Sequence, residues 1–155
     1  PFFLSIMDKG IFPITDERMT RFMITLEEGV DLVWKAFDDM IGGEIYVKKI
    51  PSMKVMDIAK AVSESATTEI VGIRPGEKLH EQMIGSEDAL HTYEYEEYYK
   101  ILPSINNWSN DPLRINNGNK VGPNFTYTSD KNSEQLDVDT LKKWIKKNRN
   151  KIGSF

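Results

Sequence analysis

The strongest local signal in the sequence is an amphipathic helix that begins after Thr25. The segment Thr25-Leu26-Glu27-Glu28 has the form of a capping box, in which the threonine hydroxyl accepts a hydrogen bond from an early helical amide and Glu28 reaches back to the Thr25 amide. Gly42-Gly43 supplies the stop signal of this helix. Between the two signals apolar residues recur at helical spacing, namely Leu26, Val30, Val33, Trp34 and Phe37. The pattern predicts one long helix.

The segments that follow this helix alternate between strand and helix patterns. Residues 44–50 alternate apolar and polar side chains, as a strand does. Ser52 is suited to cap a helix that runs to about Ser63, and the residues expected on its buried face are Met53, Met56, Ala59 and Val62. The apolar run 70–73 is short enough for a buried strand. A strand–helix–strand order predicts a crossover unit with two parallel neighbouring strands, so the expected fold class is α/β.

Shorter elements are predicted near the two ends. Residues 2–8 have the pattern of the end of a helix, residues 13–18 that of a charged turn, and residues 20–24 that of a short strand. Asp137 is suited to cap a final helix that runs to about Lys147. The residues of that helix expected to face inward are Val138, Leu141, Trp144 and Ile145.

Residues 90–131 begin with an aromatic stretch and continue as a segment with the composition of a loop. Residues 90–102 interleave tyrosines with acidic residues, which predicts two short strands or an extended arm. Because Glu94, Glu96 and Glu97 would repel phosphates, packing explains these tyrosines better than base stacking does. Residues 103–131 are rich in asparagine, glycine, proline and serine, so little regular structure is expected, and the segment is a candidate lid or substrate-lining loop.

Composition excludes several classes of protein. The chain has 155 residues, which is one domain's length, and its 39% hydrophobic and 28% charged residues are typical of globular proteins. It has no cysteine, which excludes disulfides and thiolate chemistry and is compatible with a cytoplasmic location. No apolar run approaches the roughly 20 residues of a membrane helix, so we expect no membrane partner. A net charge of −4 argues against a nucleic-acid partner.

The segment with the most chemical potential is Val71 to Glu81. Arg74-Pro75-Gly76 interrupts the apolar run, because proline keeps its predecessor extended and Pro-Gly suits a type II turn. Residues 77–84 are expected to form a short helix, so charged groups would gather where a strand meets a helix, the edge at which α/β proteins usually bind ligands. The planar fork of Arg74 suits a phosphate. A solvated turn with an arginine–glutamate surface pair fits the same residues.

Other motifs carry no chemistry. The glycines form neither a G-x-G-x-x-G loop nor a Walker loop, so no cofactor-binding residue is predicted. Tyr127 and Lys131 match a Tyr-x-x-x-Lys pattern, but the polar residues between and around them predict a loop, where the two side chains cannot share a helical face. His80 and His91 are not spaced as a metal pair. The sequence therefore predicts no catalytic residue and no metal site.

Three strings, in order, resemble one family. They are "PITDERMTRF" (Pro13–Phe22), "GGEIYVKKIPSMK" (Gly42–Lys54) and "IRPGEKLHE" (Ile73–Glu81). Together they resemble the C-terminal, substrate-binding part of the UDP-N-acetylglucosamine 4,6-dehydratases of the polysaccharide-biosynthesis family, which are extended short-chain dehydrogenase/reductases. The resemblance implies the C-terminal portion of an extended Rossmann-type fold, with a parallel strand–helix–strand unit and a small α+β substrate-binding subdomain.

The resemblance also implies what the parent protein does. Such a parent is an NADP-dependent lyase that binds a UDP-sugar, forms a homo-oligomer and produces a 4-keto-6-deoxy sugar. Residues 1–155 would form a single substrate-binding domain, and the dinucleotide-binding half that holds NADP would lie upstream of Pro1. The chain alone would then bind no NADP and be inactive. Two alternatives remain. The parent is a nucleotide-sugar 4-epimerase of the same superfamily, or the chain is a non-catalytic module that binds UDP-sugars or a partner protein.

The resemblance carries over to particular residues. In the family an arginine in the strand at 20–24 and another after the later strand grip the pyrophosphate, and these positions are Arg21 and Arg74; ordinary salt bridges are the structural alternative. Gln135 departs from the family pattern, in which an aromatic residue is expected. The complete set of candidate substrate-binding residues is Arg21, Arg74, Glu77, Tyr127, Ser129, Asn132 and Glu134.

Overall fold

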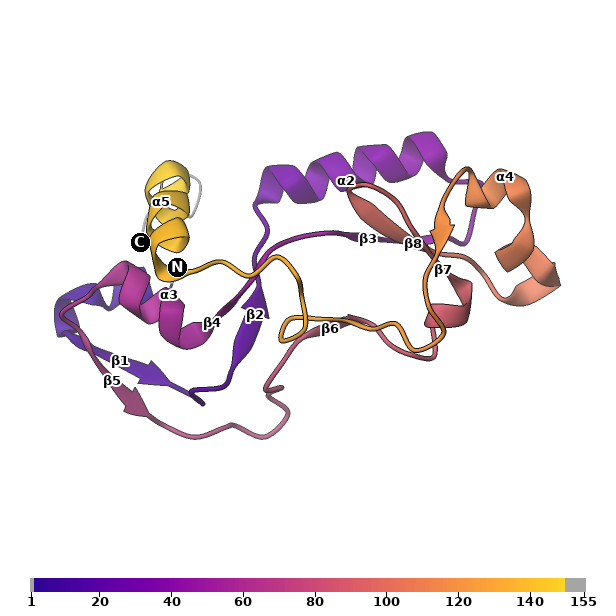
Figure 1. Ribbon diagram of the computed structural model, residues 1–155. Helices are drawn as coiled ribbons and strands as arrows, with labels where there is room; N and C mark the ends of the chain where they lie inside the picture. The colour runs from indigo at the N-terminus through magenta and orange to yellow at the C-terminus, as the bar shows by residue number, and fades with distance from the viewer. Residues whose placement is uncertain (1, 150–155) are drawn as a thin grey trace. The chain divides into compact units, whose positions relative to one another are not determined.

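The computed structural model describes residues 2–149, which divide between two compact units (Figure 1). Unit 1 contains the described residues up to 25, then 51–81 and those from 129 onward, and unit 2 contains 26–50 and 82–128. The chain therefore passes from one unit to the other several times. The prediction that residues 1–155 act as a single substrate-binding domain stays a prediction.

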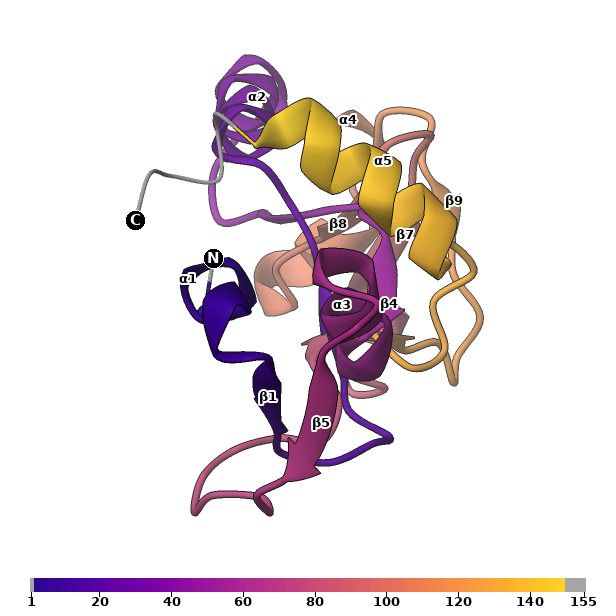
Figure 2. The same ribbon diagram turned by 90° about the vertical axis from the view of Figure 1, so that its left-hand side faces the viewer.

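Unit 1 is organised around a parallel pair of strands. Strand β1 (Ile11–Ile14) pairs in parallel with β5 (Thr67–Ile70), and the two lie side by side in Figures 1 and 2. Alternation places the β1 side chains Phe12 and Ile14 in the core, where they pack with Ala59 of helix α3 (Val55–Val62). The predicted turn at residues 13–18 is wrong at its start, because Pro13 lies within β1.

Further elements surround this pair. Helix α1 (Phe2–Ser5) and the 3₁₀ helix η1 (Met7–Lys9) precede β1, and β2 (Thr20–Phe22) pairs antiparallel with β4 (Ser52–Lys54). Helix α5 (Val138–Asn148) packs against α3 and buries Leu141 and Ile145. The Asp137 carboxylate accepts a hydrogen bond from the Thr140 amide at 2.7 Å, so the predicted cap of the final helix is confirmed.

Three local predictions about this region are wrong. Ser52 caps no helix, because it lies in β4 and α3 begins at Val55. The parallel neighbour of β5 is β1, not the strand at residues 44–50, because that strand joins an antiparallel sheet in unit 2. The later strand is Thr67–Ile70 and exposes its side chains, whereas we expected residues 70–73 to be buried.

Unit 2 is organised around a four-stranded antiparallel sheet. Its order is β3 (Ile45–Lys48), β8 (Tyr98–Ile101), β7 (Thr92–Glu94) and β9 (Asn119–Lys120). The stretch at 90–102 thus forms two strands after the 3₁₀ helix η2 (Ala89–His91), and Tyr93, Tyr98 and Tyr99 are buried. The packing explanation for these tyrosines is confirmed. A second pair joins β6 (Gln82–Ile84) to β10 (Tyr127–Thr128).

Helix α2 (Leu26–Asp39) lies against β3 and is fixed at its C-terminal end. The Asp39 carboxylate forms an ion pair with the buried Lys100 at 2.7 Å and accepts hydrogen bonds from the Tyr46 hydroxyl and the Asn116 amide. Burial opposes ionisation, but the hydrogen bonds from Lys100, Tyr46 and Asn116 outweigh it and lower the pKa of Asp39. The predicted helix is confirmed, and its last turn is anchored to the sheet.

The segment at 103–131 contains more regular structure than we expected. It includes the 3₁₀ helix η3 (Ile105–Asn110), helix α4 (Pro112–Ile115), β9 and β10. Its asparagines serve the turns, because Asn106, Asn107, Asn116 and Asn117 adopt positive φ, which asparagine tolerates better than most residues. Arg114 fixes the segment by donating to the Gly42 carbonyl at 2.6 Å and pairing with Glu44. Its role as a lid stays a prediction.

Candidate functional site

The turn that we predicted at Arg74-Pro75-Gly76 is present and follows β5. The Glu77 amide donates to the Arg74 carbonyl at 3.0 Å, and Gly76 adopts φ +82°, as the third residue of a type II turn requires. The predicted helix at 77–84 is wrong. The backbone of this stretch bonds to other segments, because the Leu79 carbonyl accepts the Thr20 amide at 3.2 Å and residues 82–84 form strand β6.

Glu77 joins three parts of unit 1 through one carboxylate. Its Oε2 accepts the Arg74 backbone amide at 3.2 Å, and its Oε1 accepts the Thr15 hydroxyl at 3.3 Å. The same Oε1 lies 3.8 Å from the Nη2 of Arg21. The carboxylate therefore closes the turn on itself and ties it to Thr15, which follows β1, and to Arg21 in β2.

Arg21 supports the loop after this turn from β2. Its Nη1 donates to the carbonyls of Thr20 at 2.7 Å and Leu79 at 3.2 Å, and its Nη2 donates to the Lys78 carbonyl at 2.9 Å. Its Nε lies 3.4 Å from the Glu81 carboxylate. The guanidinium is half-buried and directs its donors at protein oxygens, so its first effect is to hold residues 78–81 in place.

Arg74 contrasts with Arg21. Its side chain is exposed, and among residues 2–149 its guanidinium has no ion-pair partner. The backbone beneath it is fixed by the Glu77 carboxylate and the turn hydrogen bond. The structure thus presents a free guanidinium on a braced turn, which is an arrangement suited to an anionic ligand.

A buried hydroxyl pair links Ser129 to the same loop. The Ser129 hydroxyl is hydrogen-bonded to the Thr20 hydroxyl at 2.6 Å and accepts the Glu81 amide at 2.9 Å. The Thr20 hydroxyl also contacts His80 Nδ1 at 2.8 Å. Sequence reasoning missed the roles of Thr20 and His80. Their positions in the sequence could have indicated these roles, because Thr20 directly precedes the candidate Arg21 and His80 lies within the motif Ile73–Glu81.

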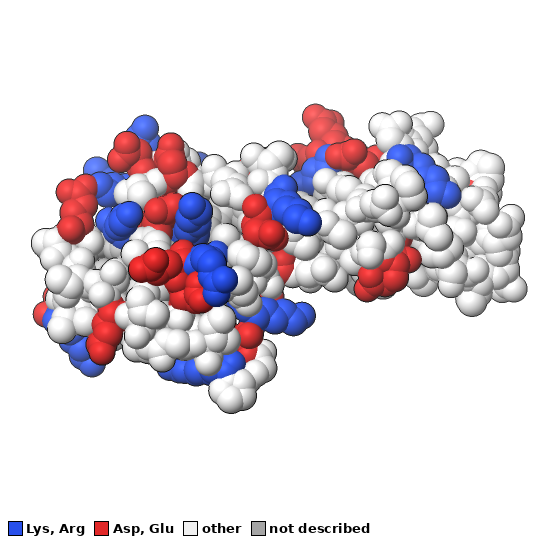
Figure 3. All heavy atoms as spheres, turned by 60° about the horizontal axis from the view of Figure 1, so that its bottom comes forward, with Lys and Arg blue, Asp and Glu red and all other residues white. Residues whose placement is uncertain are grey.

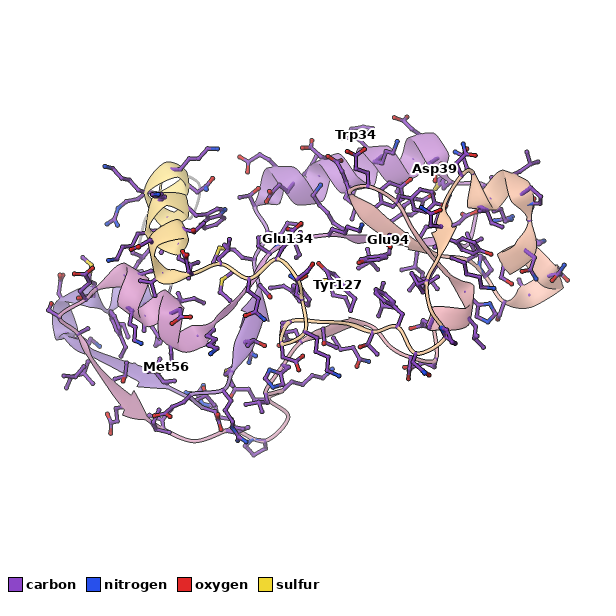
Figure 4. The ribbon with its side chains drawn as sticks, viewed as in Figure 1. Trp34, Asp39, Met56, Glu94, Tyr127 and Glu134 are labelled. Atoms are coloured by element: carbon purple, nitrogen blue, oxygen red, sulfur yellow. The ribbon has the colours of Figure 1, made fainter. Side chains whose placement is uncertain are left out.

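Asn132 and Glu134 lie on a neighbouring loop of unit 1. The Asn132 side-chain amide donates to the Glu134 carbonyl at 3.1 Å, and that carbonyl also accepts the Ser52 amide at 2.8 Å. The Glu134 side chain is exposed, and Figure 4 labels it on the loop before α5. The loop is therefore attached to β4, while its carboxylate is open to solvent.

Tyr127 belongs to unit 2 and is buried. Its hydroxyl accepts the Ile50 amide at 2.8 Å and donates to the Ile50 carbonyl at 3.0 Å. Tyr127 lies in β10, so it does not share a helical turn with Lys131. This agrees with our prediction that the Tyr-x-x-x-Lys match is not on a helix. The structure assembles Arg21, Arg74, Glu77 and Ser129 within unit 1 and places Tyr127 in the other unit.

No group of three or more His, Cys, Asp or Glu side chains that could hold a metal lies among residues 2–149. Neither strand of the parallel pair leads into a glycine-rich loop and a helix: β1 is followed by a turn and β2, and β5 by the Arg74 turn. The described residues of this pair therefore do not fit a dinucleotide.

The charges and the helices bear on other kinds of partner. On the face shown in Figure 3, positive and negative side chains are interspersed and no continuous basic patch is visible. No helix within residues 2–149 has the length and apolarity needed to cross a bilayer.

Comparisons with known proteins identify the family. Residues 1–103 match the family described as "Polysaccharide biosynthesis protein". A UDP-N-acetylglucosamine 4,6-dehydratase (inverting) of Campylobacter jejuni is 50% identical over 139 residues, which are 85% of this chain and 42% of that protein. A UDP-glucose 4-epimerase of Rickettsia conorii is 30% identical over 150 residues, which are 94% of this chain and 44% of that protein.

A solved structure supports the fold. The X-ray structure of Pen from Bacillus thuringiensis matches 96% of this chain and 45% of its own chain, with a TM-score of 0.81 and 24% sequence identity. The predicted α/β fold class, with a parallel strand pair and helices, is confirmed. The chain spans less than half the length of these relatives. By the match over residues 1–103, the chain belongs to the polysaccharide biosynthesis protein family.

Proposed function

We propose that this chain is the nucleotide-sugar-binding part of an inverting UDP-N-acetylglucosamine 4,6-dehydratase. The observation that carries the proposal is the free guanidinium of Arg74 on a turn braced by Glu77 and Arg21. The diphosphate of a UDP-sugar supplies the anionic oxygens that such a fork binds in pairs. The substrate class follows from the C. jejuni relative, whose identity of 50% exceeds the 30% of the epimerase.

In this proposal the two arginines have different tasks. Arg74 contacts the diphosphate directly because its guanidinium is free to do so. Arg21 keeps its short bonds to the loop carbonyls, at 2.7 to 3.2 Å, and adds positive charge to the site. Its carboxylate neighbours are farther away, at 3.4 and 3.8 Å, so a diphosphate can displace them at lower cost than it could displace the carbonyls.

The remaining candidate residues also fall into two groups, those that contact the substrate and those that are bonded to the protein itself. We assign contact with the sugar or the nucleoside to Asn132 and to Glu134, whose carboxylate is exposed. The Ser129 hydroxyl is engaged by protein groups, which favours a role in shaping the site, and the Tyr127 hydroxyl is engaged by Ile50 within unit 2. Direct contact with the substrate would require each hydroxyl to leave a buried partner.

We assign the chemical step to the rest of the parent enzyme. A 4,6-dehydratase needs a bound nicotinamide to accept and return a hydride, and residues 2–149 do not form a site for it. The chain would instead position the sugar, which is how binding energy is converted into rate. The isolated polypeptide should bind UDP and show no dehydratase turnover; NADP-dependent turnover by the chain alone would refute this assignment.

UDP binding by the full-length parent tests the site. Arg74→Ala should weaken UDP binding by about 10-fold to 100-fold in isothermal titration calorimetry, since a charge-assisted hydrogen bond contributes about 1.5–3 kcal/mol. Arg18→Ala is the matched control, because Arg18 is an exposed arginine of the same unit that pairs with Asp16. Equal affinities for the Arg74→Ala variant and the wild type would remove Arg74 from the site.

The epimerase relative supplies the second candidate function. The parent would then interconvert C4 epimers, and the test is the product formed from UDP-N-acetylglucosamine by the full-length enzyme. A 4-keto-6-deoxy product supports the dehydratase, and a C4 epimer with its 6-hydroxyl intact supports the epimerase.

A further inference from the structure

The last three residues of the motif are held by hydrogen bonds from two other segments of unit 1. The Leu79 carbonyl accepts the Thr20 amide at 3.2 Å, and His80 Nδ1 is bonded to the Thr20 hydroxyl at 2.8 Å. The Glu81 amide donates to the Ser129 hydroxyl at 2.9 Å, and the Glu81 carbonyl accepts the Ser129 amide at 2.9 Å. Backbone and side-chain groups therefore fix this loop residue by residue.

Three of these side chains form a series of hydrogen bonds, which we call the Thr20 network. The Thr20 hydroxyl is bonded to the Ser129 hydroxyl at 2.6 Å and to His80 Nδ1, but it has one hydrogen to donate. The Ser129 hydroxyl accepts the Glu81 amide and also has one hydrogen. Thr20 and Ser129 are buried, so the protein must supply their partners.

Two directions of the Thr20 network are possible. In the first, Ser129 donates to Thr20 and Thr20 donates to an unprotonated Nδ1 of His80, so both hydroxyl hydrogens have an acceptor. In the second, a hydrogen on Nδ1 is donated to Thr20, and Thr20 donates to Ser129. The Ser129 hydrogen then has no acceptor among residues 2–149, which is costly for a buried hydroxyl. The first direction is favoured, and it leaves the hydrogen of the imidazole on Nε2.

The network joins the three segments that carry the proposed substrate site. Thr20 directly precedes Arg21 in β2, and His80 lies in the motif that also contains Arg74. Ser129 begins the segment that leads to α5 and contains the other candidate side chains of unit 1. Thr20 is 60 residues from His80 and 109 residues from Ser129 in the sequence. A change in the network would therefore be felt in all three segments.

We propose that Thr20, His80 and Ser129 are positioning residues of the nucleotide-sugar site, and that their network fixes His80 in its Nε2–H tautomer. This inference rests on the proposed function, because the site that is positioned is the diphosphate site at Arg74. The network itself does not contact the diphosphate. It determines how the motif is bonded to β2, and so holds the Arg74 turn in one place for the ligand.

The tautomer is measured directly by NMR. The protein has 2 histidines, so labelling with 15N-histidine gives two imidazole patterns, and His80→Asn identifies the pattern that belongs to His80. We expect an Nε2–H imidazole in the 155-residue protein at neutral pH. In Thr20→Val a mixture of both tautomers should replace it, a change that a role in packing alone would not produce. A hydrogen on Nδ1 in the wild type, alone or with one on Nε2, would overturn the proposal.

Two substitutions of His80 test which ring nitrogen matters. His80→Asn places an amide oxygen as many bonds from Cα as Nδ1 is, so it can accept the Thr20 hydroxyl, whereas His80→Gln places its amide at the position of Nε2. His80→Gln should weaken UDP binding by the full-length parent about 3-fold to 10-fold in isothermal titration calorimetry, and His80→Asn should retain most of the affinity. Equal affinities, or tighter binding by His80→Gln, would overturn the positioning role.

Substitutions of Thr20 test the hydroxyl. Thr20→Val keeps the shape of the side chain and should weaken UDP binding about 3-fold to 10-fold, while Thr20→Ser should restore it. Thr68→Val is the matched control, because Thr68 is an exposed threonine of β5 in the same unit. Binding by Thr20→Val that is as tight as binding by Thr68→Val would overturn the proposal.

This inference and the proposed function can fail separately. The NMR measurement is made without nucleotide, so it tests the network whether or not UDP binds. If Arg74→Ala leaves UDP affinity unchanged and Thr20→Val lowers it, the proposed diphosphate contact fails and the positioning role stands. If Arg74→Ala lowers the affinity and Thr20→Val does not, the proposed function stands and this inference fails.

Discussion

Arg21 on β2 and Glu77 in the turn after β5 form an ion pair with 3.8 Å between Nη2 and Oε1. The pair joins two segments that are far apart in the sequence, and Arg21 also donates to carbonyls of the loop at 78–81. It also leaves the guanidinium of Arg74 as the exposed positive charge of the turn.

Removing the Glu77 charge should strengthen the binding of diphosphate. Glu77→Gln can keep its one oxygen on the Arg74 amide and turn its NH2 group toward the Thr15 hydroxyl, which can accept a hydrogen bond, and it removes a negative charge beside the substrate. We expect UDP affinity of the full-length protein to rise about twofold to fivefold at low salt, and the gain to shrink as salt is added. Glu77→Ala should instead weaken binding, because the turn loses its acceptor. Weaker binding by Glu77→Gln would contradict the electrostatic argument.

Replacing Arg21 should destabilise the loop at residues 78–81, whose carbonyls it binds. Arg21→Lys keeps the charge but cannot reach the carbonyls of Thr20, Lys78 and Leu79 together. We expect a loss of about 1–3 kcal/mol in the free energy of unfolding by urea. Amide hydrogen exchange should accelerate at residues 78–81. Unchanged exchange there would show that the loop does not depend on Arg21.

Ser129→Ala should destabilise unit 1. The substitution removes the hydroxyl that accepts the Glu81 amide and bonds to the Thr20 hydroxyl, and Thr20 keeps only its contact with His80. The expected cost is about 1–3 kcal/mol in the free energy of unfolding. Ser133→Ala is the matched control, because Ser133 is exposed in the same segment. Equal stability of the two variants would count against the buried hydroxyl pair.

Acid should weaken the attachment of α2 through Asp39. Hydrogen bonds hold the pKa of Asp39 below its usual value despite burial, so the unfolded state takes up the proton first. The stabilisation is complete above the unfolded pKa, about 3.9, and is lost as the pH falls through the lower folded pKa. In Asp39→Asn the free energy of unfolding should no longer fall with pH in this range. At neutral pH it should be about 3 kcal/mol lower than in the wild type, because Lys100 stays buried without its charged partner.

Urea unfolding across the acidic range measures this dependence. Asp38→Asn, the exposed neighbour on α2, is the control and should keep the wild-type pH profile. If Asp39→Asn also keeps that profile, another group is responsible for the acid sensitivity.

Local signals allowed several elements to be predicted correctly. The helix at 26–39, the capped helix after Asp137 and the turn at Pro75-Gly76 depend on spacing, caps and backbone preference within a few residues. The motif strings also identified the family and drew attention to Arg74, because residue identities alone carry that signal.

Errors arose where backbone hydrogen bonds are made at long range. The segment 77–84 has helical apolar spacing, but its carbonyls accept donors from Thr20 and Arg21, and its last residues pair with β10. The pairing of β5 with β1 could not be predicted for the same reason, since strand partners are chosen by the whole fold.

The sequence by itself therefore determined which segments can form helices and turns, that the chain carries no thiol, and which residues bear the family's motifs. Only the tertiary structure decided that Arg21 is engaged while Arg74 is free, and that the best amphipathic helix exposes its apolar stripe. The physical reason is that caps and periodicity act over neighbouring residues. Burial and the choice of hydrogen-bond partners depend on segments that come together only when the chain folds.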